Sequence, residues 1–143
     1  MSSLTIYLKP LSPNFCMPTK IALGAWIDLA TVEDVKYDAA DAVVIRLGFA
    51  AKLPPECEAH ILPRSSTFDR YGLIQASSGL IDESYCGGND EWLFVCYACR
   101  AGEIPAGTRV CQFRITQKMS SIIFEIVDKL DGKDRGGFGS SGR

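Results

Sequence analysis

The last nine residues of the chain, Arg135–Arg143, combine closely spaced glycines with serines, an arginine and one aromatic residue. Such glycines let backbone N–H groups approach phosphate oxygens, and serine hydroxyls add further donors. Arg135 can offer a phosphate a charge-assisted pair of hydrogen bonds, and Phe138 can stack on a flat ring. The composition therefore suits a triphosphate, although a flexible Gly/Ser-rich linker is the alternative that the segment leaves open.

A second group of anion-binding residues lies in Pro63–Thr67, where Arg64 is followed by three hydroxyl residues. A short helix is predicted from Ser65 to Tyr71, with Ser65 or Ser66 as its N-cap. Backbone N–H groups, hydroxyls and a guanidinium would then face one anion. A plain N-cap beside a solvated arginine is the alternative.

A carboxylate that could activate water occurs in the segment Gly79–Tyr85. Asp82 directly follows Leu80 and Ile81, which we expect to be strand core. A carboxylate held at the end of a strand can orient and deprotonate a water molecule. A turn aspartate that bonds only to local backbone is the alternative.

Amide donors for a ligand oxygen are available in the segment Gly107–Phe113. Its alternation predicts that Val110 points away from Arg109 and Cys111. Gln112 could then supply amide donors to a ligand, and a glutamine at a sheet edge is the alternative.

Short apolar runs of the β type must position these groups. The predicted strands are Leu4–Leu8, Trp26–Ala30, Ala42–Phe49, Glu58–Leu62, Tyr71–Gln75, Trp92–Ala98, Arg109–Thr116 and Ile122–Val127. Turn residues separate them at intervals near ten residues, which is typical of a sandwich, jelly roll or barrel. With 143 residues, we expect one all-β domain.

Composition excludes several classes of protein. The net charge of −2 and a pI near 5.4 argue against a nucleic-acid or membrane partner. No apolar run is long enough to span a membrane, and the N-terminus lacks the basic region of a signal peptide. A small anionic ligand would need a local basic pocket. The arginines available for it are Arg64, Arg109, Arg114 and Arg135.

The six cysteines are scattered, and only Cys96 and Cys99 have the C-x-x-C spacing. No second pair of cysteines lies at zinc-site spacing, and His60 is the only histidine. The sequence therefore offers too few Cys and His ligands for a metal cluster. Within a predicted strand, Cys96 and Cys99 would face opposite sides of a sheet. We expect reduced, structural thiols in a cytosolic protein.

In order and spacing, these segments resemble the five short motifs of the deoxyuridine triphosphatases (dUTPases), an all-β family of homotrimers. The resemblance runs from about Gly24 to the C-terminus. The five matching segments are, in order, Trp26–Ala30, Pro63–Thr67, Gly79–Gly87, Gly107–Phe113 and Arg135–Gly142. The Gly-Asn-Asp-Glu-Trp stretch after the third motif resembles a bacterial or prophage branch of the family.

The resemblance implies a distorted jelly roll or β-barrel with at most one short helix. Residues 1–130 would form the domain and residues 131–143 a flexible arm. It also implies hydrolysis of dUTP to dUMP and pyrophosphate with Mg²⁺, in a homotrimer whose active sites are shared between subunits. Such an enzyme limits uracil in DNA and supplies dUMP for thymidylate synthesis.

The resemblance also implies a role for each residue. Asp82 would be the general base, and Asp28 would hold the magnesium ion through water. Phosphate contacts would come from Arg64, Ser65, Ser66 and Gln112. Tyr85 would pack under the deoxyribose. The uracil-reading hairpin would include Ser77, Gly79, Leu80 and Ile81, and the tail clamp would include Arg135, Phe138, Gly139, Ser140 and Ser141.

One departure from the family pattern lies in this hairpin. Many members have an asparagine several residues before the motif-three glycine, but here the segment Gln75–Gly79 is one residue shorter, and Ser77 is the nearest counterpart.

Two alternative functions stay open. The dCTP deaminases share the fold but lack the glycine-rich tail, and some phage relatives act by binding a regulatory protein.

Overall fold

Apolar alternation along the sequence determines which face of each strand is buried. In β5 (Ala42–Lys52), Val43 and Ile45 are buried, whereas Val44 between them is exposed. The same period of two runs along β9 (Glu91–Ala98). Each of these strands therefore turns one face toward the core.

The computed structural model describes residues 3–20 and 22–137, and among these residues it contains strands and a single short helix. The other elements are β1 (Tyr7–Pro10), β2 (Thr19–Lys20), β3 (Ile27–Ala30), β4 (Val35–Tyr37), β6 (Cys57–Pro63), α1 (Thr67–Tyr71), β7 (Leu73–Gln75), β8 (Leu80–Ile81), β10 (Gly102–Ile104) and β11 (Arg109–Gln117). No helix among the described residues is long and apolar enough to cross a membrane.

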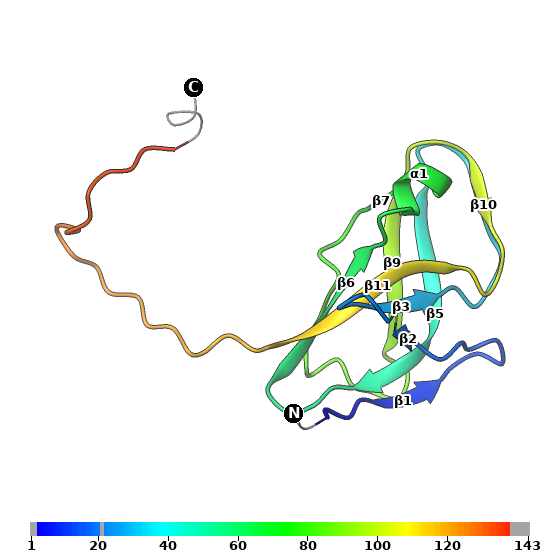
Figure 1. Ribbon diagram of the computed structural model, residues 1–143, viewed down its shortest axis with the longest axis horizontal. Helices are drawn as coiled ribbons and strands as arrows, with labels where there is room; N and C mark the ends of the chain where they lie inside the picture. Colours follow the sequence, from blue (N-terminus) through cyan, green and yellow to red (C-terminus); the bar gives the residue numbers. More distant parts are fainter. Residues whose placement is uncertain (1–2, 21, 138–143) are drawn as a thin grey trace.

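Two antiparallel sheets form the body of the molecule (Figure 1). One has the strand order β1-β5-β9-β7, and the other has the order β2-β3-β11-β6-β8. β4 and β10 form a separate two-stranded ribbon. The all-β fold with one short helix confirms the fold predicted from the sequence.

A chain of aromatic side chains joins the two sheets through the core. Phe15 meets Phe49 at 5.7 Å between ring centroids, and Phe49 meets Trp92 at 5.0 Å. Trp92 of β9 then meets Phe113 of β11 edge-to-face at 5.2 Å. Trp92 is completely buried, so this contact fixes the separation of the sheets at the level of the central strands.

The predicted strands at the start of the chain and after the helix begin too early. The first strand begins at Tyr7, so the prediction of Leu4–Leu8 was placed too early. Tyr71 ends helix α1, and β7 begins after it at Leu73. The turn between them uses Gly72 in a left-handed conformation as the C-cap, which agrees with the predicted helix end.

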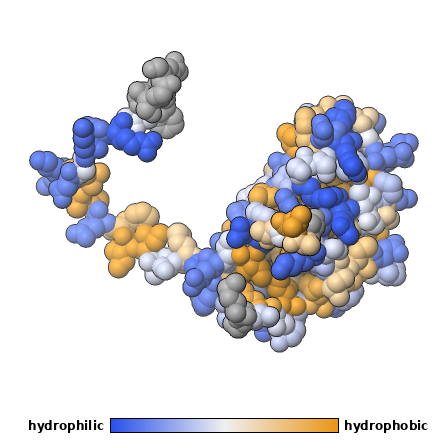
Figure 2. Space-filling view, viewed as in Figure 1, coloured by the Kyte–Doolittle hydropathy of each residue, from blue (hydrophilic) through white to orange (hydrophobic). Residues whose placement is uncertain are grey.

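The prediction of a strand at Ile122–Val127 was wrong. From Lys118 to Gly137 the chain has neither helix nor strand and extends away from the body (Figure 1). Ile123, Phe124 and Ile126 are more than nine-tenths exposed, and Figure 2 shows hydrophobic residues along this segment. A strand needs a partner edge for its backbone groups, and in the described part of a single chain this segment has none.

Gly79 holds the turn between β7 and β8 in place. Its φ is +69°, and its carbonyl accepts a hydrogen bond from the Ile61 N–H at 2.7 Å. A Cβ at this position would overlap the backbone oxygen of Ile61. Any larger residue would therefore push β8 away from β6.

Replacing Gly79 with alanine should destabilise the protein by about 2–4 kcal/mol, because the left-handed backbone and the overlap with Ile61 both add a cost. Gly107→Ala is the matched control, since Gly107 has φ +86° but no described atom lies within 4 Å of its Cβ position. The free energy of unfolding of the control should fall by only about 1–2 kcal/mol. Urea unfolding at one protein concentration measures both, and equal losses would contradict the role of the Ile61 contact.

Candidate functional site

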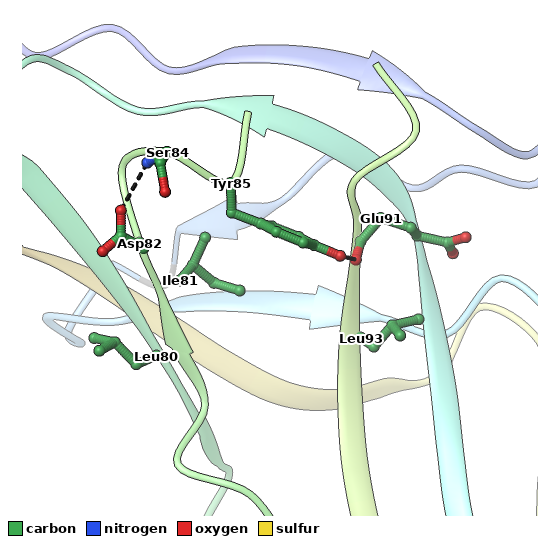
Figure 3. Close-up of a pocket in the computed structure, with 7 residues that line it drawn as sticks. All are labelled: Leu80, Ile81, Asp82, Ser84, Tyr85, Glu91 and Leu93. Atoms are coloured by element: carbon green, nitrogen blue, oxygen red, sulfur yellow. Dashed lines mark hydrogen bonds between the residues drawn. The ribbon is translucent and has the colours of Figure 1, made fainter. Parts of the chain in front are cut away.

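A cavity of about 330 Å³ lies beside the edge strand β8 (Figure 3). β8 pairs only with β6, through Ala59 with Ile81 and His60 with Leu80. The chain leaves β8 through Asp82 and turns back toward β9. The residues that line the cavity are Leu80, Ile81, Asp82, Ser84, Tyr85, Glu91 and Leu93.

The turn in which Asp82 lies stabilises its ionised form. Its Oδ1 accepts a hydrogen bond from the Ser84 backbone N–H at 2.8 Å (Figure 3). This bond, the Ser84 side chain and the charge of Lys118 together lower the pKa of Asp82 below its ordinary value, against a smaller opposing effect of burial. The carboxylate is thus available as a proton acceptor at neutral pH.

Tyr85 closes the cavity on the side of β9. Its hydroxyl donates to the backbone carbonyl of Glu91 at 2.8 Å. The Glu91 carboxylate points away from the cavity in Figure 3 and accepts two hydrogen bonds from Arg46 Nε, at 3.0 and 3.2 Å, and one from the Gly48 N–H. Because these bonds hold Glu91, the Tyr85 ring rests on a fixed strand.

A second cluster of functional side chains lies where β3, β11 and the end of β6 meet. We call Asp28, Arg64, Arg109 and Gln112 the arginine cluster. Asp28 and Gln112 are directly paired in the register of β3 and β11. Arg64 Nε lies 3.3 Å from Asp28 Oδ2, and Arg109 Nη1 lies 3.9 Å from it. The cluster thus presents two guanidiniums around one buried carboxylate.

Backbone contacts hold the arginine cluster in shape. The Arg64 N–H donates to Thr67 Oγ1, and that hydroxyl donates to the Val110 carbonyl, each at 2.9 Å. Gln112 Nε2 donates to the Pro63 carbonyl at 3.0 Å. These bonds tie the start of α1 to β11, so the loop that carries Arg64 is fixed to the sheet.

The two groups lie far apart along β6. Ile81 is level with Ala59, and Asp82 lies beyond it in the direction away from Arg64. Arg64 is five residues past Ala59, so roughly 17 Å of strand separates Arg64 from the level of Ile81 at about 3.4 Å per residue. Within one chain, the backbone positions of Asp82 and Arg64 are thus separated by most of the length of β6.

The structure therefore brings the predicted site residues together in two groups. Leu80, Ile81, Asp82 and Tyr85 line the cavity. Ser65 and Ser66 follow Arg64 at the start of α1. Ser66 is the N-cap but makes no capping hydrogen bond with its side chain.

The remaining predicted residues lie outside both groups. Ser77 is exposed in the turn before Gly79, and neither lines the cavity. Arg135 is exposed in the extended arm. The predicted clamp residues Phe138, Gly139, Ser140 and Ser141 lie outside the described residues.

Three expectations about strand faces were wrong. Leu80 is 46% exposed and Ile81 half-buried, because β8 is a two-residue edge strand rather than core. Val110 and Cys111 are both buried, because a bulge between Arg109 and Cys111 breaks the alternation. Cys99 lies beyond the end of β9 and is exposed.

The cysteines make no metal site with other described residues. All six are free thiols, and no cluster of three or more His, Cys, Asp or Glu side chains that could hold a metal occurs among the described residues. Burial raises the pKa of the Cys96 thiol to about 12, which makes it inert at neutral pH.

Sequence reasoning missed several residues of the site. Ser84 acts through a local backbone hydrogen bond. The spacing of Asp82 and Ser84 is that of an Asx turn, and this signal could have identified Ser84. Glu91 and Leu93 reach the cavity from β9 only through tertiary pairing, which no local pattern reveals.

The family model of the dUTPases matches residues 16–142. The chain belongs to the dUTPase family. A prophage-derived deoxyuridine 5'-triphosphate nucleotidohydrolase of Bacillus subtilis (strain 168), from SPbeta, is 45% identical over 140 residues, covering 97% of this chain and 99% of the relative. The deoxyuridine 5'-triphosphate nucleotidohydrolase of Rhodococcus erythropolis is 33% identical over 143 residues, covering 97% and 87%. This dUTPase thus groups with a prophage-like branch.

Solved structures of phage dUTPases share the fold. A mutant of the Staphylococcus bacteriophage 80alpha dUTPase with dUpNHpp has a TM-score of 0.78 at 20% identity, covering 96% of this chain and 98% of that one. A phage phi11 dUTPase mutant, described as coordinating a structural Mg(II) ion, has a TM-score of 0.73 at 17% identity, covering 90% and 99%. At these identities the likeness establishes the dUTPase-like fold alone.

The lowered pKa of Asp82 can be tested by replacing Ser84 with alanine. The variant keeps the backbone N–H but loses the side-chain donor, so the pKa of Asp82 should rise part of the way toward its ordinary value. Carboxyl carbon NMR during an acid titration measures it. Glu83, whose pKa is lowered by the Glu56 N–H and Lys118, is the internal control, and its pKa should change less than that of Asp82 because Asp82 has only a minor influence on it. An unchanged or lower pKa at Asp82 would contradict the assignment.

Proposed function

We propose that this dUTPase hydrolyses dUTP to dUMP and pyrophosphate at sites that two or more subunits of a homotrimer build together. Family membership supports the reaction. The observation that carries the shared site is the distance along β6 between Asp82 and Arg64. A nucleotide that uses both groups must take them from different chains, because the span far exceeds three linked phosphates.

The exposed apolar arm independently supports an assembly. Ile123, Phe124 and Ile126 together expose far more apolar surface than an isolated surface residue. Contiguous exposed apolar surface of this kind marks an interaction site. A second copy of the chain would supply the partner edge that the segment Ile122–Val127 lacks, and cyclic symmetry would repeat the contact.

Asp82 is the general base of the proposed reaction. Its carboxylate accepts a proton from a water molecule as the water oxygen attacks the α-phosphorus. The bond from the α-phosphorus to the oxygen that bridges it to the β-phosphate breaks, and pyrophosphate leaves with the electron pair of that bond. An aspartate is ionised at neutral pH, and the turn at Ser84 favours the ionised form further, so no other group has to remove the proton of Asp82 first.

The cavity beside β8 is the proposed site of the nucleoside. Backbone groups of Leu80 and Ile81 would read the uracil edge, and the Tyr85 ring would pack under the deoxyribose, where a 2′-hydroxyl would clash. Cytosine would leave buried donors and acceptors unpaired, which costs more than the loss of an apolar contact. Ser77 and Gly79 shape the hairpin that presents these groups.

The phosphates are assigned to the arginine cluster of a neighbouring chain. Arg64, Ser65, Ser66 and Gln112 offer a guanidinium, hydroxyls and an amide at the start of α1. Positioning and charge stabilisation of this kind account for much of catalysis at phosphorus. The tail from Arg135 onward, with its Phe138 stack and the donors of Gly139, Ser140 and Ser141, would close over the γ-phosphate and exclude water.

Magnesium assistance, which the family resemblance implies, stays a prediction for this chain. When bound to the triphosphate, Mg²⁺ would neutralise phosphate charge, and a hard cation that keeps its water needs few protein ligands. Asp28, predicted to reach the ion through water, has a side chain that is 1% exposed, so in this conformation its carboxylate does not meet solvent.

The two alternative functions are less well supported. A dCTP deaminase is disfavoured because the family model that matches is that of the dUTPases and reaches residue 142. A regulatory role is described for the phage 80alpha dUTPase, in control of the transfer of virulence genes. At 21% identity that likeness extends to the fold only, so a regulatory partner stays a prediction. Limiting uracil in DNA and supplying dUMP are the proposed roles in the cell.

Asp82→Asn should bind dUTP but lose turnover by about 10² to 10⁴, because the nearly isosteric amide cannot accept the proton. Glu83→Gln is the matched control. Glu83 is the adjacent carboxylate, but it bonds Lys118 and the Glu56 N–H and does not line the cavity. Pyrophosphate release from dUTP measures both variants. An Asp82→Asn protein with more than half of the original turnover would exclude Asp82 as the base.

Complementation tests the shared site. Asp82→Asn and Arg64→Gln chains, each of low activity, are unfolded together in equal amounts and refolded. If neighbouring chains share sites, every mixed trimer holds one site with both residues intact, and random mixing should restore about a quarter of the original activity. Native mass spectrometry checks that mixed trimers form.

The control for complementation mixes Asp82→Asn chains with chains that carry both substitutions. No mixed trimer in that sample contains an intact site, so activity should stay at the level of the parents. If the first mixture forms mixed trimers and also stays at that level, each site belongs to one chain and the proposal of a shared site is wrong.

A further inference from the structure

Asp28 is a buried carboxylate in the middle of a sheet. It lies on β3 between β2 and β11, and its side chain is 1% exposed. Neither carboxylate oxygen reaches solvent or accepts a hydrogen bond of good geometry from the described residues. In this conformation a water molecule of a hydrated metal ion has no access to Asp28, and the residue does not fit the role predicted from the family resemblance.

The charge of Asp28 is instead opposed by arginine. Arg64 Nε lies 3.3 Å from Asp28 Oδ2, whereas Arg109 Nη1 lies 3.9 Å away on a side chain that is half exposed. A buried carboxylate is costly unless a cation compensates it. Since Arg64 is the nearer cation, Asp28 and Arg64 stabilise each other in this arrangement.

Arg64 is held at a second point. Its Nη1 donates to the Arg109 carbonyl at 3.1 Å, and its backbone N–H is bound by Thr67. A guanidinium has five N–H donors in a rigid plane, so contacts at Nε and Nη1 fix the direction of the remaining donors. The Arg64 side chain is still 30% exposed, so part of it reaches the surface.

We propose that Asp28 is a positioning residue that holds the Arg64 guanidinium in the orientation that receives a phosphate group. The inference rests on the proposed function in taking that phosphate to belong to dUTP. Asp28 acts on the phosphate only through Arg64, and this action does not need a metal ion.

Binding measurements in the Asp82→Asn protein, which should not consume dUTP, test the inference. Asp28→Asn should weaken binding of dUTP about tenfold or more, the range expected when a charge-assisted contact is lost. The loss should be equal in Mg²⁺ and in EDTA. Asp34→Asn, which changes an exposed carboxylate that accepts the Ala106 N–H, is the control and should bind as the parent does.

A double-mutant cycle tests the route through Arg64. Arg64→Gln alone should weaken binding, and adding Asp28→Asn to it should produce little further loss. Calorimetry with inorganic triphosphate as a second probe separates the role of Asp28 from the proposed function. If the protein binds triphosphate but not dUTP, the proposed substrate is wrong. Comparing triphosphate binding with and without Asp28→Asn then still decides the role of Asp28.

Three results would overturn the inference. A loss seen only with Mg²⁺ would mean that Asp28 acts through the metal. Full additivity with Arg64→Gln would mean that it acts independently of Arg64. Unchanged binding in Asp28→Asn would mean that it positions nothing. Should that variant fail to fold, Arg64→Lys is measured in its place. It keeps the charge but not the planar fork, and it should also weaken binding equally with and without Mg²⁺.

Discussion

The antiparallel pairing of β6 with β8 on one side and β11 on the other is the constraint on which the site depends. Pairing with β8 places Asp82 beyond the level of Ala59, near the start of β6. Pairing with β11 brings Gln112 level with Leu62, near the end of β6 where Arg64 follows. The proposed water-activating group, Asp82, and the proposed phosphate-binding group, Arg64, thus lie near opposite ends of β6. Because an extended strand cannot bring its two ends together, we propose that a neighbouring chain completes the site.

The core explains how such separated groups can be held firmly. The contact of Trp92 with Phe113 joins the central strands of the two sheets, and both residues are buried. β9, which carries Trp92, also carries the Glu91 carbonyl that receives the Tyr85 hydroxyl. β11, which carries Phe113, also carries Gln112. Packing in the middle of the molecule therefore fixes the strands that present each half of the site.

The sequence predicted the central strands well because their alternation has a physical cause, the burial of one face. The same rule failed at Val110 and Cys111, where a bulge lets two successive residues face inward. It also failed at β8, because a two-residue edge strand has too little pattern to reveal its exposure. It failed as well at Ile122–Val127, where the residues have the composition of a strand but no partner edge exists in the described part of a single chain.

The sequence indicated residue types for the candidate site but not their geometry. Spacing along the chain drew attention to Asp82, Arg64 and Gln112 without indicating that they lie at two ends of a strand. Asp28 lies between apolar neighbours, and both it and Leu29 are buried, with Arg64 and Arg109 lying against the Asp28 carboxylate. Alternation alone would have placed one of them at the surface.

The central claim is that Asp82 and Arg64 act on one nucleotide from different chains. A crystal structure of the Asp82→Asn protein with dUTP bound tests it most directly. The account predicts a trimer in which the base and sugar contact Leu80 and Tyr85 of one chain, while the phosphates contact Arg64 of a second chain. A nucleotide bound by Arg64 and by the position-82 residue of the same chain would contradict it.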